Sequence, residues 1–209
     1  MFKRIIEDVN AVRDRDPAAR SFWEVFFLYP GVKAIRMHRR AHFYYKHNLK
    51  FLARWVSQRA VRKTGIEIHP GATIGRRLVI DHGVGIVIGE TTEIGNDVLI
   101  YQGVTLGGTG KDVGKRHPTI GNNVMISAGA KVLGPFKIGD NSRVAAGAVV
   151  LNEVPPNSTV VGVPARVVRQ DGKRVALDQI HIPDPVKQKM DALEERIALL
   201  EAALKEKSK

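Results

Sequence analysis

Two histidines stand in settings that suit acid–base chemistry. His82 follows Asp81 and precedes a glycine, and His117 follows Arg116 and precedes a proline. Imidazole is the side chain that most often takes up or delivers a proton near neutral pH. A single histidine of this kind is more often structural. Because two such histidines occur together with the loop that adjoins His117, we treat both as candidate catalytic residues.

That loop is a glycine-rich, basic segment, residues 107–119, which reads GGTGKDVGKRHPT. Functional residues often lie on loops that leave a rigid scaffold. The alternative is a surface insertion that the fold merely tolerates, because long loops are thermodynamically inexpensive.

The element that must position these residues is a six-residue repeat between residues 66 and 168. A helix has a period of 3.6 and a strand a period of 2, so a sustained period of six fits neither. It predicts a parallel β-helix in which about three units form one coil and the aliphatic residue points into the core. The repeated residues are Ile68, Ile74 and Ile80, then Ile88, Ile94, Ile100 and Leu106, then Ile120, Ile126, Val132, Ile138, Val144 and Val150.

Residues 1–64 are expected to form a helical domain that covers the first coil, because the terminal repeats of a solenoid need a cap. Apolar residues recur there at helical spacing, and one long helix is expected from residue 32 to about residue 62. Asp16 before Pro17 predicts the N-cap of an earlier helix. The histidines of the long helix are interpreted as packing or surface residues.

After residue 168 the pattern changes twice. Residues 169–185 are polar with two prolines and predict a linker. Residues 186–207 carry a heptad stripe, which predicts an amphipathic helix. A lone helix of this length is marginal in water, so it needs a partner. A coiled coil between subunits and docking onto the solenoid remain open. The stripe consists of Val186, Met190, Leu193, Ile197, Leu200 and Leu204.

Composition excludes several classes of function. The net charge of +12 raises the question of nucleic acid, yet the basic residues form no run with interleaved aromatics, so we expect none. Zero cysteines exclude disulfides, a thiol nucleophile and zinc–thiolate sites. No segment has the length and apolarity of a membrane span, and no signal-peptide pattern is found. We therefore expect no membrane partner and a cytoplasmic location.

Several strings together resemble serine O-acetyltransferase, a family of the hexapeptide-repeat acyltransferase superfamily. They are VRDRDPA at 12–18, DHGVGIVIGET at 81–91, VTLGGTGK at 104–111, RHP at 116–118 and GVPA at 162–165. The repeat and the last string are common to many acyltransferases, whereas the combination of the others is specific. The resemblance covers about residues 8–168.

The resemblance implies transfer of the acetyl group of acetyl-CoA to the hydroxyl of L-serine, giving O-acetyl-L-serine and CoA in cysteine biosynthesis. It implies a mainly β protein, a left-handed parallel β-helix at residues 65–168, without a metal. It also implies a homotrimer with active sites between adjacent subunits, with a dimer of trimers as a further option.

By position in the motifs, the resemblance gives each residue a role. His82 is the general base, and His117 comes from a neighbouring subunit to orient the substrate. Arg116 binds the serine carboxylate, while Asp81 and Asp16 hold the amino group. A base of this kind suits a hydroxyl nucleophile, and a guanidinium can bind a carboxylate through two parallel hydrogen bonds.

Further residues follow from the same resemblance. Glu67 stands where the family often has the aspartate that orients the base. The residues expected to contact acetyl-CoA are Gly108, Thr109, Lys111, Ala128, Arg143 and Ala146. O-acetylserine sulfhydrylase is the implied partner protein; family members bind it through a terminal Ile, whereas this chain ends KEKSK.

Three other functions would each account for part of the sequence. An acetyltransferase for a sugar or other hydroxyl would keep His117 and the CoA groove but would not need Arg116 or Asp16. A β-helical carbonic anhydrase would need a histidine cluster for zinc, and the repeat offers only His69 besides the two candidates. A non-catalytic scaffold would leave the histidine strings unexplained.

Overall fold

The computed structural model of the protein describes residues 2–108, 110, 113–174, 193 and 196–197. Its contacts divide the chain into two compact units, Met1–Val175 and Ala176–Lys209. The heptad helix predicted at 186–207 lies outside the described residues, apart from Leu193, Arg196 and Ile197, which are helical.

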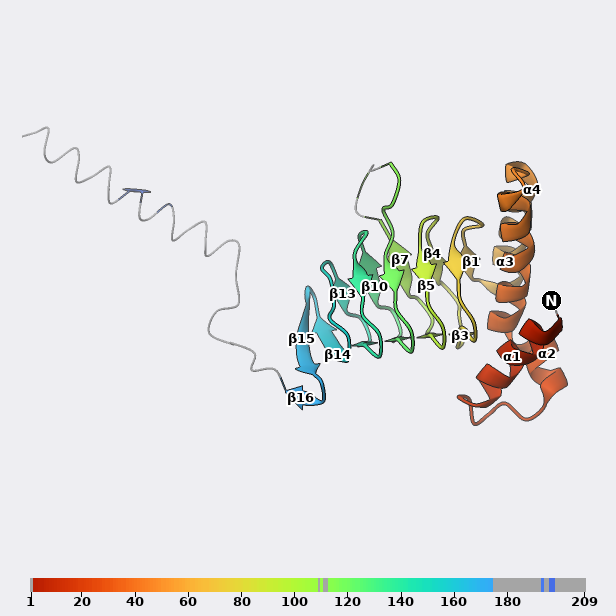
Figure 1. Ribbon diagram of the computed structural model, residues 1–209, viewed down its shortest axis with the longest axis horizontal. Helices are drawn as coiled ribbons and strands as arrows, with labels where there is room; N and C mark the ends of the chain where they lie inside the picture. Colours follow the sequence, from red (N-terminus) through yellow and green to blue (C-terminus); the bar gives the residue numbers. More distant parts are fainter. Residues whose placement is uncertain (1, 109, 111–112, 175–192, 194–195, 198–209) are drawn as a thin grey trace, which may run out of the picture. The chain divides into compact units, whose positions relative to one another are not determined.

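The unit Met1–Val175 is built on a parallel β-helix, whose short strands follow one another around three sheets in the described part of the chain (Figure 1). Each of the first four coils contributes one strand to each sheet, and strands of successive coils pair in parallel register. Ile68 lies beside Ile88 of the next coil, which lies beside Leu106 of the third. Equivalent repeat positions are thus stacked, which confirms the predicted period.

Within each sheet the strands follow one another in chain order. Sheet A contains β1 (Glu67–Ile68), β4 (Val87–Ile88), β7 (Thr105–Gly107), β10 (Lys131–Leu133) and β13 (Val149–Val150). Sheet B contains β2 (Thr73–Ile74), β5 (Glu93–Ile94), β8 (Thr119–Ile120) and β11 (Lys137–Ile138). Sheet C contains β3 (Val79–Ile80), β6 (Leu99–Ile100), β9 (Met125–Ile126), β12 (Arg143–Val144), β14 (Ser158–Gly162), β15 (Ala165–Gln170) and β16 (Lys173–Arg174).

The repeated aliphatic residues form one continuous core. Ile100 on β6, Leu106 on β7, Ile126 on β9 and Val132 on β10 have no exposed surface. Burying each such side chain contributes roughly 1.5–3 kcal/mol relative to leaving it in water. Because one coil has neighbours only above and below, this stabilisation depends on unbroken stacking.

One corner of the solenoid, where sheet B is followed by sheet C, carries a file of residues with positive φ. This backbone conformation is unfavourable for residues with a Cβ atom, and Asn and Asp tolerate it best. The side-chain amide of Asn123 donates to Asn141 (3.0 Å), and that of Asn141 donates to Asn157 (2.9 Å). We call the file the corner ladder; its members are Arg77, Asp97, Asn123, Asn141 and Asn157.

Helices precede the solenoid: α1 (Phe2–Arg13), α2 (Phe22–Leu28), α3 (Pro30–Lys46) and α4 (Lys50–Thr64). The Ser21 hydroxyl accepts a hydrogen bond from the Glu24 N–H and caps α2, so the prediction of Asp16 as an N-cap is wrong. None of the described helices combines the length and the apolar character needed to cross a membrane.

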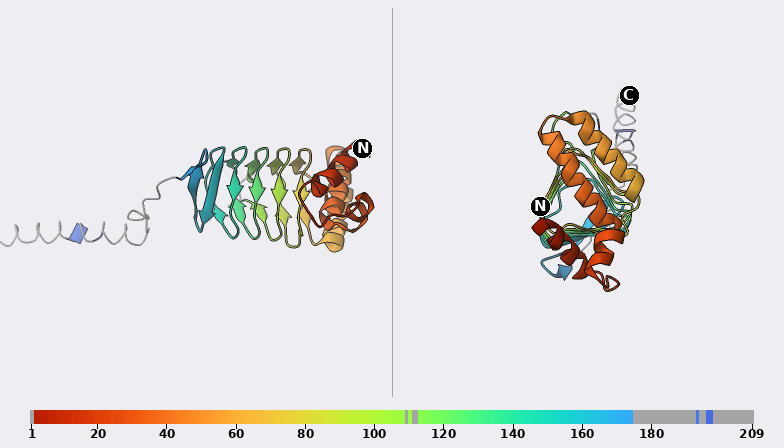
Figure 2. Two further views of the ribbon diagram at one scale, coloured as in Figure 1. Left: turned by 90° about the horizontal axis from the view of Figure 1, so that it is seen from below. Right: turned by 90° about the vertical axis from the view of Figure 1, so that its right-hand side faces the viewer.

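The single long helix predicted from residue 32 to residue 62 is instead two helices, α3 and α4, which pack along each other (Figure 2). Helix α3 ends because Asn48 has a φ of 60°. The next N–H, that of Leu49, then donates to the Tyr44 carbonyl (2.9 Å), which is the hydrogen bond of a Schellman cap. A helix-terminating asparagine was therefore present in the sequence but not recognised.

Helices α3 and α4 cover the first coil, as the need for a cap predicts. The Ser57 hydroxyl donates to the Ile68 carbonyl (2.9 Å), and Gly31 packs so closely that any side chain there would collide with the Ile80 carbonyl. His38 is buried in this contact, and burial lowers its pKa to about 3, so the ring is neutral. This confirms His38 as a packing residue.

The far end of the solenoid closes differently from the prediction. Strands β14, β15 and β16 form an antiparallel meander, and Asp171 and Gly172, both with positive φ, make its last turn. Residues 169–174 were expected to begin a linker, but they belong to these strands because an Asp-Gly pair favours a tight hairpin turn. The remaining linker residues, 175–185, lie outside the described residues.

The corner ladder generates a stability prediction. We expect Asn141→Ala to lower the free energy of unfolding by about 1–2 kcal/mol, because alanine disfavours positive φ and loses two ladder hydrogen bonds. Asn141→Gly should lose less, since glycine adopts this conformation freely. Urea unfolding at fixed protein concentration measures both. Asn152→Ala, at an exposed asparagine outside the ladder, is the control; an equal loss there would contradict the account.

Candidate active site

His117, a candidate catalytic residue, is held by Thr91 of the preceding coil. Its Nδ1 accepts a hydrogen bond from the Thr91 backbone N–H (3.2 Å) and lies 2.9 Å from Thr91 Oγ1. The same oxygen accepts from the backbone N–H groups of Arg116 (3.0 Å) and His117 (3.1 Å), so the hydroxyl proton is directed at the ring. The neutral ring therefore carries its own proton on Nε2.

The surroundings of His117 keep its ring uncharged. The residue is 9% exposed, and burial, followed by the charge of Arg116, lowers the pKa of the imidazole. Gly89 faces the ring, and a side chain there would overlap it. The residue is thus suited to donate a hydrogen bond through Nε2 to a bound molecule.

The guanidinium of Arg116 is fixed by a carboxylate that the sequence motifs did not single out. Its Nη2 donates to Glu90 Oε2 (2.5 Å), and the hydroxyl of Tyr45 on α3 donates to Glu90 Oε1 (2.8 Å). The hydrogen bonds from Tyr45 and Arg116 lower the pKa of Glu90, which keeps it ionised at neutral pH. Helix α3 is therefore connected to Arg116 through one carboxylate.

The same corner holds further residues that sequence reasoning missed. His69 lies edge-on to Tyr45, with ring centroids 5.9 Å apart, and its Nδ1 accepts from the Gly71 N–H (3.1 Å). Tyr45, Gly71, Glu90, Thr91 and Lys115 are among the residues that line a hollow of about 350 Å³. Glu90 and Thr91 end the string DHGVGIVIGET, so their motif was available as a signal although their roles were not.

His82, the other candidate, lies at a strained turn between β3 and β4. Its φ is 56°, and its side chain is exposed. A left-handed backbone at a residue other than Gly, Asn or Asp costs about 1–2 kcal/mol and is often found at functional sites. Gly83 after it packs against the first coil, where a side chain would meet Ile66. The tight turn therefore projects the imidazole away from the core.

Asp81 and Asp16, predicted to bind one amino group, act on the same phenol. The hydroxyl of Tyr29 donates to Asp16 Oδ2 (2.8 Å), and Asp16 Oδ1 accepts from the Ala18 N–H (2.8 Å). Burial first, then Asp16, and more weakly the charges of Glu24 and Asp81, raise the pKa of Tyr29 to about 12. The structure thus joins Asp16 to Tyr29, while Asp81 directly precedes His82 in the chain.

The two candidate histidines, however, lie at different corners of the solenoid. His82 lies where sheet C is followed by sheet A, and His117 lies where sheet A is followed by sheet B. Among the described residues, no hydrogen bond joins them. The predicted site residues of one chain therefore fall into two groups, which we call half-sites: Asp16, Asp81 and His82 in one, and Arg116 and His117 in the other.

Two residues predicted to contact acetyl-CoA share the corner of His82. Ala128 follows β9 and Ala146 follows β12, so both lie where sheet C is followed by sheet A. They stack on successive coils, since the N–H of Gly147 donates to the Ala128 carbonyl (2.9 Å). At Gly129 and Gly147, which follow them, an added Cβ would meet nothing within 4 Å. On these two coils the corner therefore presents a strip of open backbone.

The remaining predicted residues are more scattered. Gly108 lies at the base of the loop, where a Cβ would approach the Arg116 carbonyl to 3.0 Å, and Arg143 is exposed on β12. Thr109 and Lys111 lie outside the described residues. Glu67 on β1 forms an ion pair with Arg54 of α4 (3.6 Å), so its orientation of His82 stays a prediction.

The described residues contain no set of side chains that could bind a metal ion. No group of three or more His, Asp or Glu side chains there lies close enough to hold an ion, and the sequence has no cysteine. What the corners offer instead is an exposed imidazole at His82, a neutral imidazole donor at His117, a fixed guanidinium at Arg116 and the carboxylates of Asp16 and Asp81.

Comparison with known proteins accords with these groups. Residues 117–152 match the family model described as bacterial transferase hexapeptide (six repeats). The chain is 56% identical over 208 residues to the serine acetyltransferase of Bacillus subtilis (strain 168), an alignment that covers 99% of this chain and 96% of the relative.

Solved structures are similar as well. The crystal structure of Neisseria gonorrhoeae serine acetyltransferase in complex with serine has a TM-score of 0.78 and 43% identity, covering 80% of this chain and 69% of that one. A serine acetyltransferase in complex with cysteine has a TM-score of 0.80 and 45% identity, covering 81% and 66%. With identity of this extent over almost its whole length, the chain belongs to the serine acetyltransferases.

Proposed function

We propose that the chain transfers the acetyl group of acetyl-CoA to the hydroxyl of L-serine at a site shared by adjacent subunits of a homotrimer. The observation that carries the proposal is the separation of His82 and His117 on different corners of one chain. In a cyclic trimer each subunit contacts its neighbour through two different patches, so the two half-sites can face each other. The complex of the Neisseria relative with serine supports this substrate.

In the proposed reaction, His82 removes the proton of the serine hydroxyl as its oxygen attacks the thioester carbonyl of acetyl-CoA. The new C–O bond forms, the C–S bond breaks, and the proton on His82 passes to the departing CoA thiolate. General-base catalysis of this kind is typically worth about 10²–10⁴-fold. The exposure of the imidazole on its strained turn supports this role.

The other groups would hold serine in place. Arg116, oriented by Glu90, would bind the carboxylate, and Asp81 and Asp16 would bind the ammonium group. His117, neutral and with its proton on Nε2, would donate a hydrogen bond to the substrate.

Acetyl-CoA would lie along the corner that carries His82, Ala128 and Ala146. Small residues and exposed backbone let the pantetheine arm approach closely. The Gly108 segment would donate a backbone N–H to the oxyanion of the tetrahedral intermediate. Lys111 and Arg143 remain the proposed phosphate contacts, with Thr109 beside them, and Glu67 remains the proposed partner of His82.

Several architectural proposals accompany this one. We keep a left-handed β-helix, a helical domain at 1–64, a repeat domain that begins at residue 65 and a C-terminal heptad helix at 186–207. Helices α3 and α4 on the first coil support the division at residue 64. The dimer of trimers, the sulfhydrylase partner and the cytoplasmic location stay predictions.

The alternative acceptor and the base are tested together. Thiol release from acetyl-CoA should require L-serine, and a sugar should not replace it. We expect His82→Ala to lower kcat by about 10²–10⁴-fold while CoA binding, measured by calorimetry, is kept. His47→Ala, at an exposed histidine between α3 and α4, is the control. Near-normal kcat in His82→Ala, or serine-independent turnover, would contradict the proposal.

The link from α3 to Arg116 gives a second prediction. We expect Tyr45→Phe to raise the KM for serine roughly three- to tenfold with little change in kcat, because Glu90 loses a hydrogen bond and Arg116 its fixed orientation. Glu90→Gln should raise it further. Tyr44→Phe on the same helix is the matched control. A fall in kcat at unchanged KM, or equal effects of the two tyrosines, would rule out the positioning role.

A further inference from the structure

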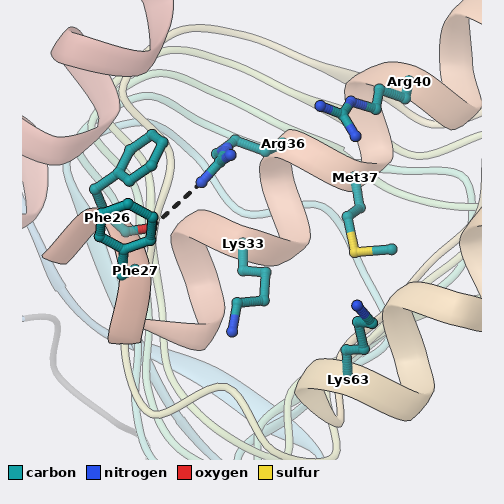
Figure 3. A pocket seen from close by; sticks show the side chains of 7 residues that line it. All are labelled: Phe26, Phe27, Lys33, Arg36, Met37, Arg40 and Lys63. Atoms are coloured by element: carbon teal, nitrogen blue, oxygen red, sulfur yellow. Dashed lines mark hydrogen bonds between the residues drawn. The ribbon is translucent and has the colours of Figure 1, made fainter. Parts of the chain in front are cut away.

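A small pocket on the helices, lined by none of the predicted site residues, is bordered by positive charge. It has a volume of about 240 Å³ and is lined by residues of α2, α3 and α4. Figure 3 shows Lys63 extending from α4 toward Met37 on α3, with Phe26 and Phe27 at the other end. We call it the basic pocket, because four of the residues that line it are basic: Lys33, Arg36, Arg40 and Lys63.

Within the part of the chain that the structure describes, the basic pocket has no counter-charge. None of its four cations has a carboxylate within 4.0 Å, although Arg39 between two of them on α3 is paired with Asp8. Like charges brought together in one hollow repel one another, and an anion between them removes that cost. Burial, followed by the charge of Arg40, lowers the pKa of Arg36 in agreement with this.

Arg36 is held in place before any ligand binds. Its guanidinium lies over the Phe26 ring, 4.0 Å from the centroid, and its Nη1 donates to the Phe26 carbonyl at 3.3 Å (Figure 3). A stacked guanidinium keeps its remaining N–H groups available in a fixed plane. Fixing a cation in advance reduces the entropy that binding must remove.

Size and charge define the class of ligand. A hollow of about 240 Å³ is below the range of roughly 300–1,000 Å³ that suits drug-sized molecules, so it fits a small ion. Four cations favour a multivalent anion over a monocarboxylate, and planar guanidinium groups match phosphate oxygens.

We propose that the basic pocket binds a compact multivalent oxyanion with linked phosphate groups, of the size of pyrophosphate. Such a site would join α2, α3 and α4 through a ligand distinct from serine and acetyl-CoA. It would also use part of the net charge of +12 that the acetyl-transfer chemistry leaves unexplained.

The test is calorimetric titration of the full-length protein with inorganic pyrophosphate at constant ionic strength. We expect saturable binding, one ion per chain, and a raised unfolding temperature, since a ligand of the native state stabilises it. Arg36→Gln/Arg40→Gln should weaken binding about tenfold or more, as loss of charge-assisted hydrogen bonds does. Lys3→Gln/Arg174→Gln removes the same charge from exposed positions elsewhere and should change affinity less than about twofold.

A second variant tests the basic pocket independently of the double variant, and a second ligand distinguishes a free phosphate compound from a lipid surface. Lys63→Gln alters only an exposed side chain of α4 and should also weaken binding, even if the double variant fails to fold. Vesicles of phosphatidylglycerol test whether the phosphate belongs to a lipid surface. Equal weakening by the two double variants, no saturable pyrophosphate binding, or binding of vesicles alone would overturn the proposal.

Discussion

The parallel register between successive coils is the constraint on which the rest of the molecule depends. Backbone hydrogen bonds such as those from His69 to Ile88 and from Gly89 to Leu106 (2.9 and 3.0 Å) keep equivalent residues of each coil directly above one another. The burial, backbone conformation and exposure of one repeat position therefore recur at the equivalent position of the next coil. The core, the corner ladder and the backbone strip beside Ala128 and Ala146 are all consequences of this stacking.

The same stacking limits what one chain can do. Residues on one corner are brought together along the axis, whereas residues on different corners are held apart by the packed core. His82 and His117 fall into the second class. A rigid solenoid cannot fold one corner onto another, so a reaction that needs both histidines needs a second copy of the chain. In the proposed mechanism, assembly of a trimer is therefore a requirement of the chemistry.

The sequence predicted the features that depend on local or periodic signals. The six-residue period identified the β-helix because the buried aliphatic recurs in every strand, and the short motifs identified the family. What it missed depends on contacts that spacing does not encode. Tyr45 meets Glu90 across 45 positions, and only the packing of α3 on the solenoid brings them together.

Two turn signals in the sequence did not lead to a correct prediction, because the apolar or polar pattern around them indicated another structure. The apolar pattern continued through the end of α3, so the cap at Asn48 was overlooked. Polar composition suggested a linker at 169–174, although the turn at Asp171 and Gly172 favours a hairpin. In both cases the backbone conformation of one or two residues decided the structure, and composition did not reveal it.

The most direct test of the shared site is subunit mixing. His82→Ala and His117→Ala chains, each inactive as homotrimers, would be unfolded together, refolded at a 1:1 ratio and assayed for serine-dependent thiol release. If each site takes its two histidines from neighbouring subunits, random trimers contain about one intact site in four, and roughly a quarter of the wild-type activity returns. If both histidines act within one chain, no mixed trimer contains an intact site, and the absence of recovered activity would contradict the account.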